Sequence, residues 1–291
     1  QIRSINLKQY GQTYKIISSK KVKIQGIHGK VSVNGLDQFI SDPDVEFANA
    51  KLLNLPDGYY LKITTYKNKE EKIYNGKELG IDFGCITSFT TSEGEKISAI
   101  VQESDRLKKL SRKIHGQVKG SKNRLKTRKL FQIEYQYLSN VKDDLANKIS
   151  EKFLEYDKIY IQDEQLANWH KNGHGKAVQH SVLGRVKSRL KDKPNVIVLS
   201  KWEPTTKLCP NCLSRNKLKQ SERIYRCKCG YELDRDIHAA RNMIYIGKVP
   251  TEYRDLKPKA LKPVENLTSF GVNSVIDSNK FNSMKQEDFT L

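Results

Sequence analysis

The chain has 291 residues, and its 53 Lys and Arg against 33 Asp and Glu give a formal net charge of +20 at pH 7. This length is enough for about two domains, and no run of about 18 apolar residues suggests a membrane span. So large an excess of one sign favours a polyanionic partner, above all nucleic acid, over simple solubilisation. No signal peptide opens the chain, and its start at Gln1 rather than Met indicates a fragment, a processed chain or a missing beginning.

The first 78 residues are predicted to form short strands joined by turns. Pro56-Asp57-Gly58 is typical of a tight hairpin. A charged stretch at 66–78 indicates a linker to the next domain. The alternating or β-branched segments are Lys15–Ile24, Val31–Val33, Ala50–Leu53 and Tyr59–Thr65. Their pattern predicts a small β-barrel or curled sheet.

A mixed α/β pattern begins at Leu79. A strand hairpin around Ile81-Asp82-Phe83 is followed by a long helical stretch, 102–156, that is broken near 116–120. Two short β-branched strands, Lys158–Ile161 and Val196–Leu199, and a helix over Ile237–Ile246 complete the pattern. The residues beyond Lys248 are polar and aperiodic, and we expect them to form a mobile tail.

Four of the five cysteines form two close pairs. Cys209-Pro210-Asn211-Cys212 and Cys227-Lys228-Cys229 are separated by 14 residues, a spacing typical of two knuckles that close a tetrahedral zinc site without an open position for catalysis. Two disulfides are the alternative, but cysteine usage in a chain of this length favours a reducing cytoplasm. The sequence therefore predicts one structural Zn²⁺, held by Cys209, Cys212, Cys227 and Cys229, with Cys85 as a separate packed thiol.

Three carboxylates lie at the ends of predicted core elements. Asp82 lies in an apolar strand, Glu164 follows the strand Lys158–Ile161, and Asp236 opens the last helix. Each has an ordinary alternative, as a turn residue, a surface charge and a helix N-cap respectively. Taken together in a chain suited to a polyanion, they favour a site that holds two Mg²⁺ or Mn²⁺ ions for phosphodiester hydrolysis.

The helical stretch begins with a densely basic segment, 105–129. Its side chains could line a channel for a nucleic-acid duplex, or they could form a solvated helix face. The candidate nucleic-acid-binding residues are Arg106, Lys109, Arg112, Lys113, Lys122, Arg124, Lys126 and Arg128. A second candidate is the Gly-flanked segment Trp169–Lys176, which suits either stacking on a base or an ordinary surface loop.

Four blocks, in this order, resemble the TnpB family of transposon-encoded, RNA-guided DNA endonucleases, which are related to type V CRISPR effectors. They are Gly80-Ile81-Asp82-Phe83-Gly84, Ile161-Gln162-Asp163-Glu164, the cysteine knuckles, and the segment from Asp234-Arg235-Asp236 to Met243. The resemblance implies that Asp82, Glu164 and Asp236 bind the catalytic metal, with Asp234 in support. The order Gln-Asp-Glu leaves Asp163 as an alternative to Glu164 in the metal-binding position. We favour Glu164.

By this resemblance the chain should combine an RNase H-like (RuvC) nuclease domain with an inserted zinc ribbon and an N-terminal wedge domain, a β-barrel. The implied boundaries are 1–78 for the wedge domain, 79–203 for the first two nuclease segments, 204–233 for the zinc ribbon, 234–250 for the third nuclease segment and 251–291 for the tail.

The implied function is RNA-guided hydrolysis of target DNA by a two-metal-ion mechanism, in the prokaryotic cytoplasm and at the nucleoid. Guide RNA would supply target sequence, and the protein would read a short flanking DNA motif. The alternatives are a nuclease-inactive, RNA-guided repressor and a transposase accessory protein without a guide. The three retained carboxylates argue against the repressor, and the chain shows no separate strand-transfer motif.

Overall fold

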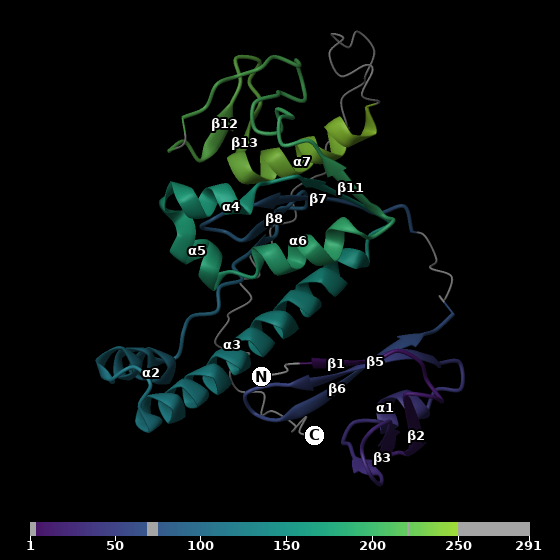
Figure 1. Ribbon diagram of the computed structural model, residues 1–291. Coiled ribbons are helices and arrows are strands. Elements are labelled where there is room, and N and C mark those ends of the chain that lie inside the picture. The colour runs from purple at the N-terminus through teal and green to yellow at the C-terminus, as the bar shows by residue number, and fades with distance from the viewer. Residues whose placement is uncertain (1–3, 69–74, 220, 250–291) are drawn as a thin grey trace. The chain divides into compact units, whose positions relative to one another are not determined.

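The computed structural model describes residues 4–68, 75–219 and 221–249 (Figure 1). Contacts divide the chain into two compact units. Among the described residues, the first unit holds 4–68 and 105–136, and the second holds 75–104 and 137–249. The predicted domain boundaries remain a prediction, and the predicted tail lies outside the described residues.

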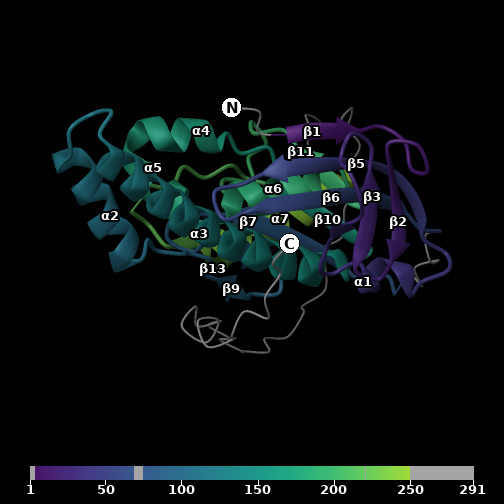
Figure 2. The same cartoon turned by 60° about the horizontal axis from the view of Figure 1, so that its bottom comes forward.

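Two small antiparallel sheets form the N-terminal part of the first unit. One has the order β1-β5-β6 and the other β2-β3-β4, and Figure 2 shows β1, β5 and β6 side by side. Their bounds are Ser4–Leu7 (β1), Tyr14–Ser18 (β2), Lys21–Ile24 (β3), Val31–Ser32 (β4), Glu46–Asn54 (β5) and Tyr59–Tyr66 (β6), with the short helix α1 at Asp37–Ile40. The predicted β-barrel is not confirmed, because no strand pairing in this described segment closes either sheet.

Local turns explain where these strands agree with the sequence pattern and where they differ. The predicted hairpin is present, since the Leu55 and Gly58 backbones donate to each other's carbonyls at 2.8 and 3.3 Å. The predicted strand Lys15–Ile24 is instead the hairpin β2–β3, turned at Ser19-Lys20. The reversal lets Tyr14, Val22 and Ile24 reach one buried cluster.

The predicted helical stretch is two helices, α2 (Asp105–Gly116) and α3 (Lys122–Leu154). Gly120 takes a positive φ of 85° in the break, a conformation that costs glycine little. Ser121 immediately precedes α3, and its Oγ accepts from the Arg124 backbone N–H at 3.2 Å. The Arg124 side chain donates to the carbonyls of Ile114 and Gln117, at 2.8 and 2.7 Å, so it holds the break together.

The second unit is built on a five-stranded mixed sheet of order β11-β10-β7-β8-β9. Strands β7, β10 and β11 run parallel, while β8 and β9 are antiparallel. The bounds are Glu78–Phe83 (β7), Phe89–Thr91 (β8), Lys96–Ile97 (β9), Lys158–Gln162 (β10) and Val196–Leu199 (β11). The predicted strands around Asp82, at 158–161 and at 196–199 are thus confirmed.

Helices cover both faces of this sheet. The main core joins the strands to Ile149 and Phe153 of α3 and to Val186 and Leu190 of α6 (Leu183–Lys191). On the other face lies α7 (Arg235–Lys248), with Met243 and Ile246 against Tyr160 and Leu199; Figure 1 shows α6 and α7 on opposite sides. Between β10 and α6 run α4 (Leu166–Trp169), a π-helix (His170–His174) and α5 (Gly175–His180).

Helix α7 approaches the sheet closely because a glycine lies beneath it. A Cβ on Gly80 of β7 would stand 1.9 Å from the Ala240 carbonyl oxygen, so no larger residue fits without a backbone shift. Gly80 thereby sets the distance between β7, which carries Asp82, and α7, which carries Asp236.

Candidate functional site

The four predicted cysteine ligands converge. Their Sγ atoms all lie within 4.8 Å of one another, with 3.6 Å between those of Cys209 and Cys229 and 3.4 Å between those of Cys212 and Cys227. Four sulfur atoms that coordinate one ion tetrahedrally at about 2.3 Å lie about 3.8 Å from one another, close to these distances. All five cysteines are free of disulfides. The donor set and its spacing therefore fit Zn²⁺.

Local turns aim the sulfurs at one point. In the first knuckle, the Leu213 N–H donates to the Cys209 carbonyl at 2.9 Å, and Leu213 takes a positive φ of 60°. In the second, Gly230 turns with a φ of 89° between β12 (Ile224–Arg226) and β13 (Glu232–Asp234). Hydrogen bonds, first of all from the backbone N–H of Cys229, lower the pKa of the Cys227 thiol to about 5, while burial raises the pKa of the Cys209 thiol. The low pKa of Cys227 favours the thiolate, the form that binds a metal.

The segment 204–233, called the cysteine module below, is held to α7 by buried contacts. Asn242 donates from Nδ2 to the carbonyls of Thr205 and Leu208, both at 2.7 Å. His238 is fully buried and stacks on Tyr225, with ring centroids 3.7 Å apart. Loss of the cysteine site would therefore disturb the helix that carries Asp236.

Asp82 and Glu164 lie at the same edge of the sheet. Strands β7 and β10 are parallel with Ile81 opposite Ile161, so Asp82 is level with Gln162. Glu164 follows two residues later. The carboxyl ends of parallel strands meet at one edge, where open α/β sheets usually bind their ligands.

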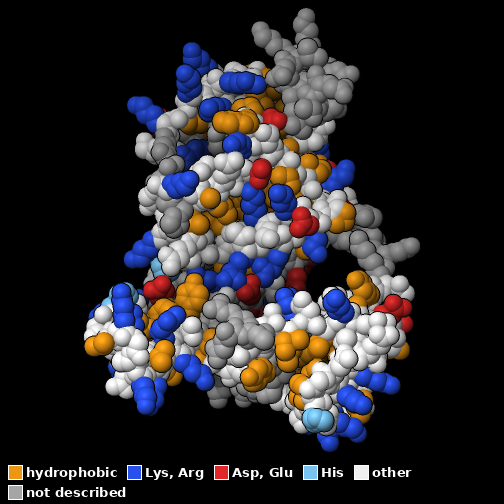
Figure 3. Space-filling view, in the orientation of Figure 1, with side chains coloured by type: hydrophobic (Ala, Val, Ile, Leu, Met, Phe, Trp, Pro, Cys, Tyr) orange, Lys and Arg blue, Asp and Glu red, His pale blue; other side chains and the backbone are white. Residues whose placement is uncertain are grey.

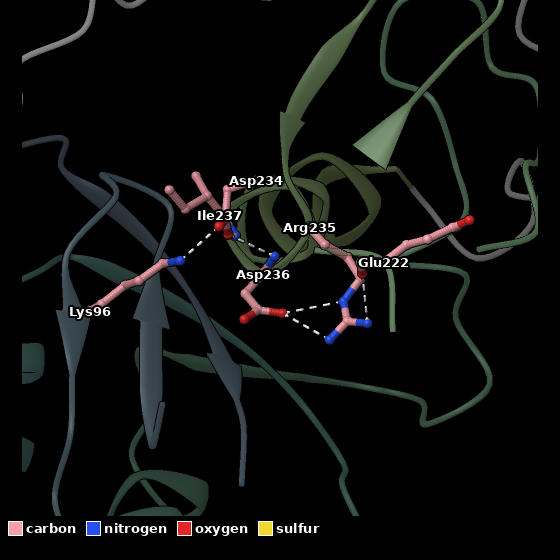
Figure 4. A network of polar contacts seen from close by, with 6 residues as sticks. All are labelled: Lys96, Glu222, Asp234, Arg235, Asp236 and Ile237. Carbon is pink, nitrogen blue, oxygen red and sulfur yellow. Dashed lines mark hydrogen bonds and ion pairs between the residues drawn. The ribbon is translucent and has the colours of Figure 1, made fainter. Parts of the chain in front are cut away.

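Asp236 reaches this edge from α7. The helix is capped by Asp234, whose side chain accepts from the backbone N–H groups of Asp236 (3.0 Å) and Ile237 (3.2 Å). Asp234 also pairs with Lys96 at 2.7 Å (Figure 4). The N-cap alternative considered for Asp236 therefore belongs to Asp234, and the Asp236 carboxylate is left for other contacts.

The three carboxylates interact electrostatically. Burial raises the pKa of Asp82 well above its usual value, and the negative charges of Asp236 and Glu164 raise it further. Burial also raises the pKa of Glu164, although the charge of Lys187 and a hydrogen bond from the Trp169 side chain oppose this. Carboxylates that repel one another in a partly buried place favour a bound cation. All-oxygen donors of this kind fit Mg²⁺ or Mn²⁺.

A cationic side chain already stands among them. Arg235 donates from Nε and Nη2 to Oδ1 of Asp236, at 3.3 Å each, and from Nη1 to the Glu222 carbonyl at 3.1 Å (Figure 4). Its charge also lowers the pKa of Asp82. In the described part of the chain, only the four cysteines bring three or more ligand atoms close enough together for one ion. The three carboxylates are not gathered in this way, and the Asp236 carboxylate contacts Arg235.

Asp163 and Glu164 have different surroundings. Lys187 of α6 donates from Nζ to Oδ1 of Asp163 at 2.7 Å and to the Glu164 carbonyl at 2.6 Å. Its hydrogen bond lowers the pKa of Asp163. Glu164 is among the charges that act most strongly on Asp82. Sequence reasoning gave no role to Lys187, which no motif marks, or to Arg235, although Arg235 stands within the segment Asp234-Arg235-Asp236.

The predicted nucleic-acid-binding residues lie on α2 and the first half of α3. All are exposed except Arg124, which is half-buried and holds the helix break. Arg106 is paired with Glu134 at 3.4 Å. Lys and Arg side chains are spread over these helices in the view of Figure 3. The helices thus display the predicted positive charge, while Arg124 has a structural contact.

Comparison with known proteins finds a matching family model and a curated relative. The family model "Cas12f1-like, TNB domain" matches residues 185–243, from α6 through the cysteine module to α7. A curated protein of Streptomyces pristinaespiralis, named "Putative RNA-guided DNA endonuclease", is 30% identical over 208 residues, which are 68% of this chain and 51% of that protein. The chain thus spans about half the length of this relative.

Among solved structures, a "Cryo-EM structure of the Cas12f1-sgRNA-target DNA complex" matches with a TM-score of 0.46 and 14% identity, over 72% of this chain and 47% of the other. The residues that the family model matches include the four cysteines and Asp236. The chain thus joins a mixed α/β sheet to a four-cysteine module of the Cas12f1-like kind. By its family-model match and its curated relative, it is similar to TnpB/Cas12f-like proteins.

Proposed function

We propose that the chain is, or is part of, an RNA-guided DNA endonuclease with a single RuvC-like site at Asp82, Glu164 and Asp236. The observation that carries this proposal is the parallel pairing of β7 with β10, which brings Asp82 and Glu164 to one edge of the sheet, where the charge of Asp236 from α7 also acts on Asp82. The relative named as an RNA-guided DNA endonuclease supports it, as do the net charge of +20 and the exposed basic helices.

In this proposal each part of the chain has a defined task. Asp82, Glu164 and Asp236 would hold Mg²⁺ or Mn²⁺, which supply an activated water and stabilise the leaving oxygen of a phosphodiester. Lys187 orients the Asp163-Glu164 segment by holding its backbone and the neighbouring side chain. Asp234 holds the start of α7. The cysteines would bind a structural Zn²⁺, which keeps the module folded and leaves the chemistry to the carboxylates.

Guide RNA and target DNA are the proposed partners. A guide–target hybrid is held through its backbone, with sequence read by base pairing. The exposed lysines and arginines of α2 and α3 suit such backbone contacts. No helix in the described residues is long and apolar enough to cross a membrane.

The test is cleavage of target DNA by the protein purified with its RNA. Cleavage should require the RNA and a divalent ion, and it should fall by orders of magnitude in Asp82→Ala, Glu164→Ala and Asp236→Ala. Asp163→Ala serves as the matched control and should be milder, because its carboxylate pairs with Lys187. Binding of RNA and target should persist in all four variants.

Three kinds of result would change the proposal. RNA-dependent target binding without cleavage in the unaltered protein would favour the alternative of a nuclease-inactive repressor. Activity without any RNA would favour the alternative of a transposase accessory protein. Cleavage that survives a chelator, or the Asp82→Ala change, would show that the nuclease site lies elsewhere.

A further inference from the structure

Trp202 is the most exposed large hydrophobic side chain in the described part of the chain, with 82% of its surface accessible. A tryptophan left in water gives up the stabilisation that its burial would supply. It lies in the loop Ser200–Glu203, which follows β11 and precedes the cysteine module. No sequence motif singled out this loop.

The loop is held firmly, so the exposed ring is presented by an ordered backbone. Gln162 is buried at the end of β10, and its Nε2 donates to the carbonyls of Ser200 and Glu203, both at 3.0 Å. Thr205 in turn donates to Oε1 of Gln162 at 3.0 Å, and the Glu203 N–H closes the turn onto the Ser200 carbonyl at 3.1 Å. The backbone on both sides of Trp202 is therefore fixed.

Sheet topology places this loop beside the carboxylates. Strands β10 and β11 are parallel with Gln162 opposite Leu199, so the loop leaves the same edge of the sheet as Glu164. The Asp163 N–H donates to the Leu199 carbonyl at 2.9 Å, and the charges of Lys191 and Lys201 act on Asp163. The loop thus joins an aromatic ring and positive charge next to the candidate nuclease site.

This combination fits single-stranded nucleic acid. An aromatic ring stacks on an unpaired base, while lysines contact the adjacent phosphates. Lys201 Nζ lies over the Trp202 ring, 4.7 Å from its centroid, so a cation stands on one face of the ring. A duplex offers no free base face along its length.

We propose that Trp202 and Lys201 form a stacking platform for an unpaired nucleotide of the DNA strand that enters the carboxylate site. The assignment of that strand as the one to be cut rests on the proposed function. The stacking itself does not, because it depends only on the ring, the lysine and the ordered loop.

The experiment measures binding of the full chain, with its co-purified RNA and in chelator, to a fluorescein-labelled oligo(dT) of 12 nucleotides. Trp202→Ala should weaken binding by about fivefold or more, since stacking on one base accounts for at least that factor. Trp202→Phe should keep most of the affinity. The matched control is Tyr59→Ala, which removes another exposed ring, 61% accessible, on β6, and should bind as the unaltered protein does.

A second measurement reports the stacking directly. Oligo(dT) should quench the tryptophan fluorescence of the unaltered protein and of Asp82→Ala, and Trp202→Phe should lose most of this quenching. Equal affinities of Trp202→Ala and Tyr59→Ala, with zinc content and melting temperature unchanged, would overturn the platform. So would an equal loss of affinity for a 12-base-pair duplex. If the protein binds oligo(dT) through Trp202 but does not cleave DNA, the proposed nuclease function is rejected and the stacking platform still stands.

Discussion

Arg235 and Asp236 are adjacent in sequence, and their side chains face each other across two hydrogen bonds of 3.3 Å. Arg235 is also tied to the Glu222 carbonyl at 3.1 Å, in the loop that leads into β12. One guanidinium thus connects the cysteine module to a carboxylate of the candidate nuclease site. Since the two side chains are only 18% and 22% exposed, water screens this pair incompletely.

Replacing Arg235 by Gln should strengthen the binding of divalent cations. The guanidinium opposes a second cation at Asp236 and Asp82 by Coulomb repulsion, so its loss should lower the Kd for Mn²⁺ by about fivefold, on the order of 1 kcal/mol. Mn²⁺ titration followed by electron paramagnetic resonance measures this. Arg226→Gln is the control, because Arg226 pairs with Glu232 in the exposed β12–β13 hairpin. Weaker Mn²⁺ binding in Arg235→Gln would instead make Arg235 a support for the ligand geometry.

Purified protein should contain about one zinc per chain, held by the four cysteines. Cys212→Ser should lose the zinc and unfold the module, because site formation and folding are coupled. Metal analysis and circular dichroism under reducing conditions check this. Cys85→Ser should retain the zinc, since Cys85 lies outside the cysteine group. Zinc retained in full by Cys212→Ser, or two disulfides in the purified protein, would contradict the assignment.

Nucleic-acid binding should depend strongly on salt through α2 and α3. Each neutralised phosphate contributes about −0.9 to the log–log slope on duplex DNA, so Lys109→Gln, Lys113→Gln and Lys126→Gln together should make the slope shallower by up to about 2.7. Target preference should stay the same. The measurement is the affinity for duplex DNA at several salt concentrations, for the unaltered protein and the triple variant. An equal slope in both proteins would assign these lysines to a solvated face.

Arg124 should behave differently from those lysines. It bonds to the carbonyls of Ile114 and Gln117, so Arg124→Gln should lower the melting temperature, with a loss of roughly 1–3 kcal/mol of stability for hydrogen bonds to a charged group. Thermal unfolding measures it. Lys126→Gln is the matched change on the same helix and should leave the melting temperature within error. Equal melting temperatures for the two variants would show that the contacts at the break contribute little.

Gly80→Ala should destabilise the second unit severely. The added Cβ would meet the Ala240 backbone oxygen at 1.9 Å, and a backbone atom cannot move aside as a flexible side chain can. Overpacking of this kind costs about 3 kcal/mol or more. Chemical denaturation compares it with Gly116→Ala at the end of α2, where a Cβ meets nothing within 4 Å. That control should be neutral or stabilising by up to about 1 kcal/mol. Similar stabilities would mean that α7 can shift away from β7.

Features that depend on near neighbours were predictable from the sequence. The two knuckles, the strands at 158–161 and 196–199 and the break between α2 and α3 follow from spacings of a few residues. The beginning of α7 was predicted two residues late, because Asp234, rather than Asp236, satisfies its first N–H groups. The resemblance named Asp82, Glu164 and Asp236, and their catalytic role stays a prediction.

Only the tertiary structure decided which groups surround those carboxylates. Lys187 reaches Asp163 from a helix 24 residues later in the chain, Arg235 lies among carboxylates from three segments, and Trp202 reaches their edge because β11 pairs with β10. Periodicity and spacing report local backbone structure, whereas these contacts depend on strand order and on the packing of α6 and α7. For the same reason the sequence pattern suggested a barrel where the strands pair into two separate sheets.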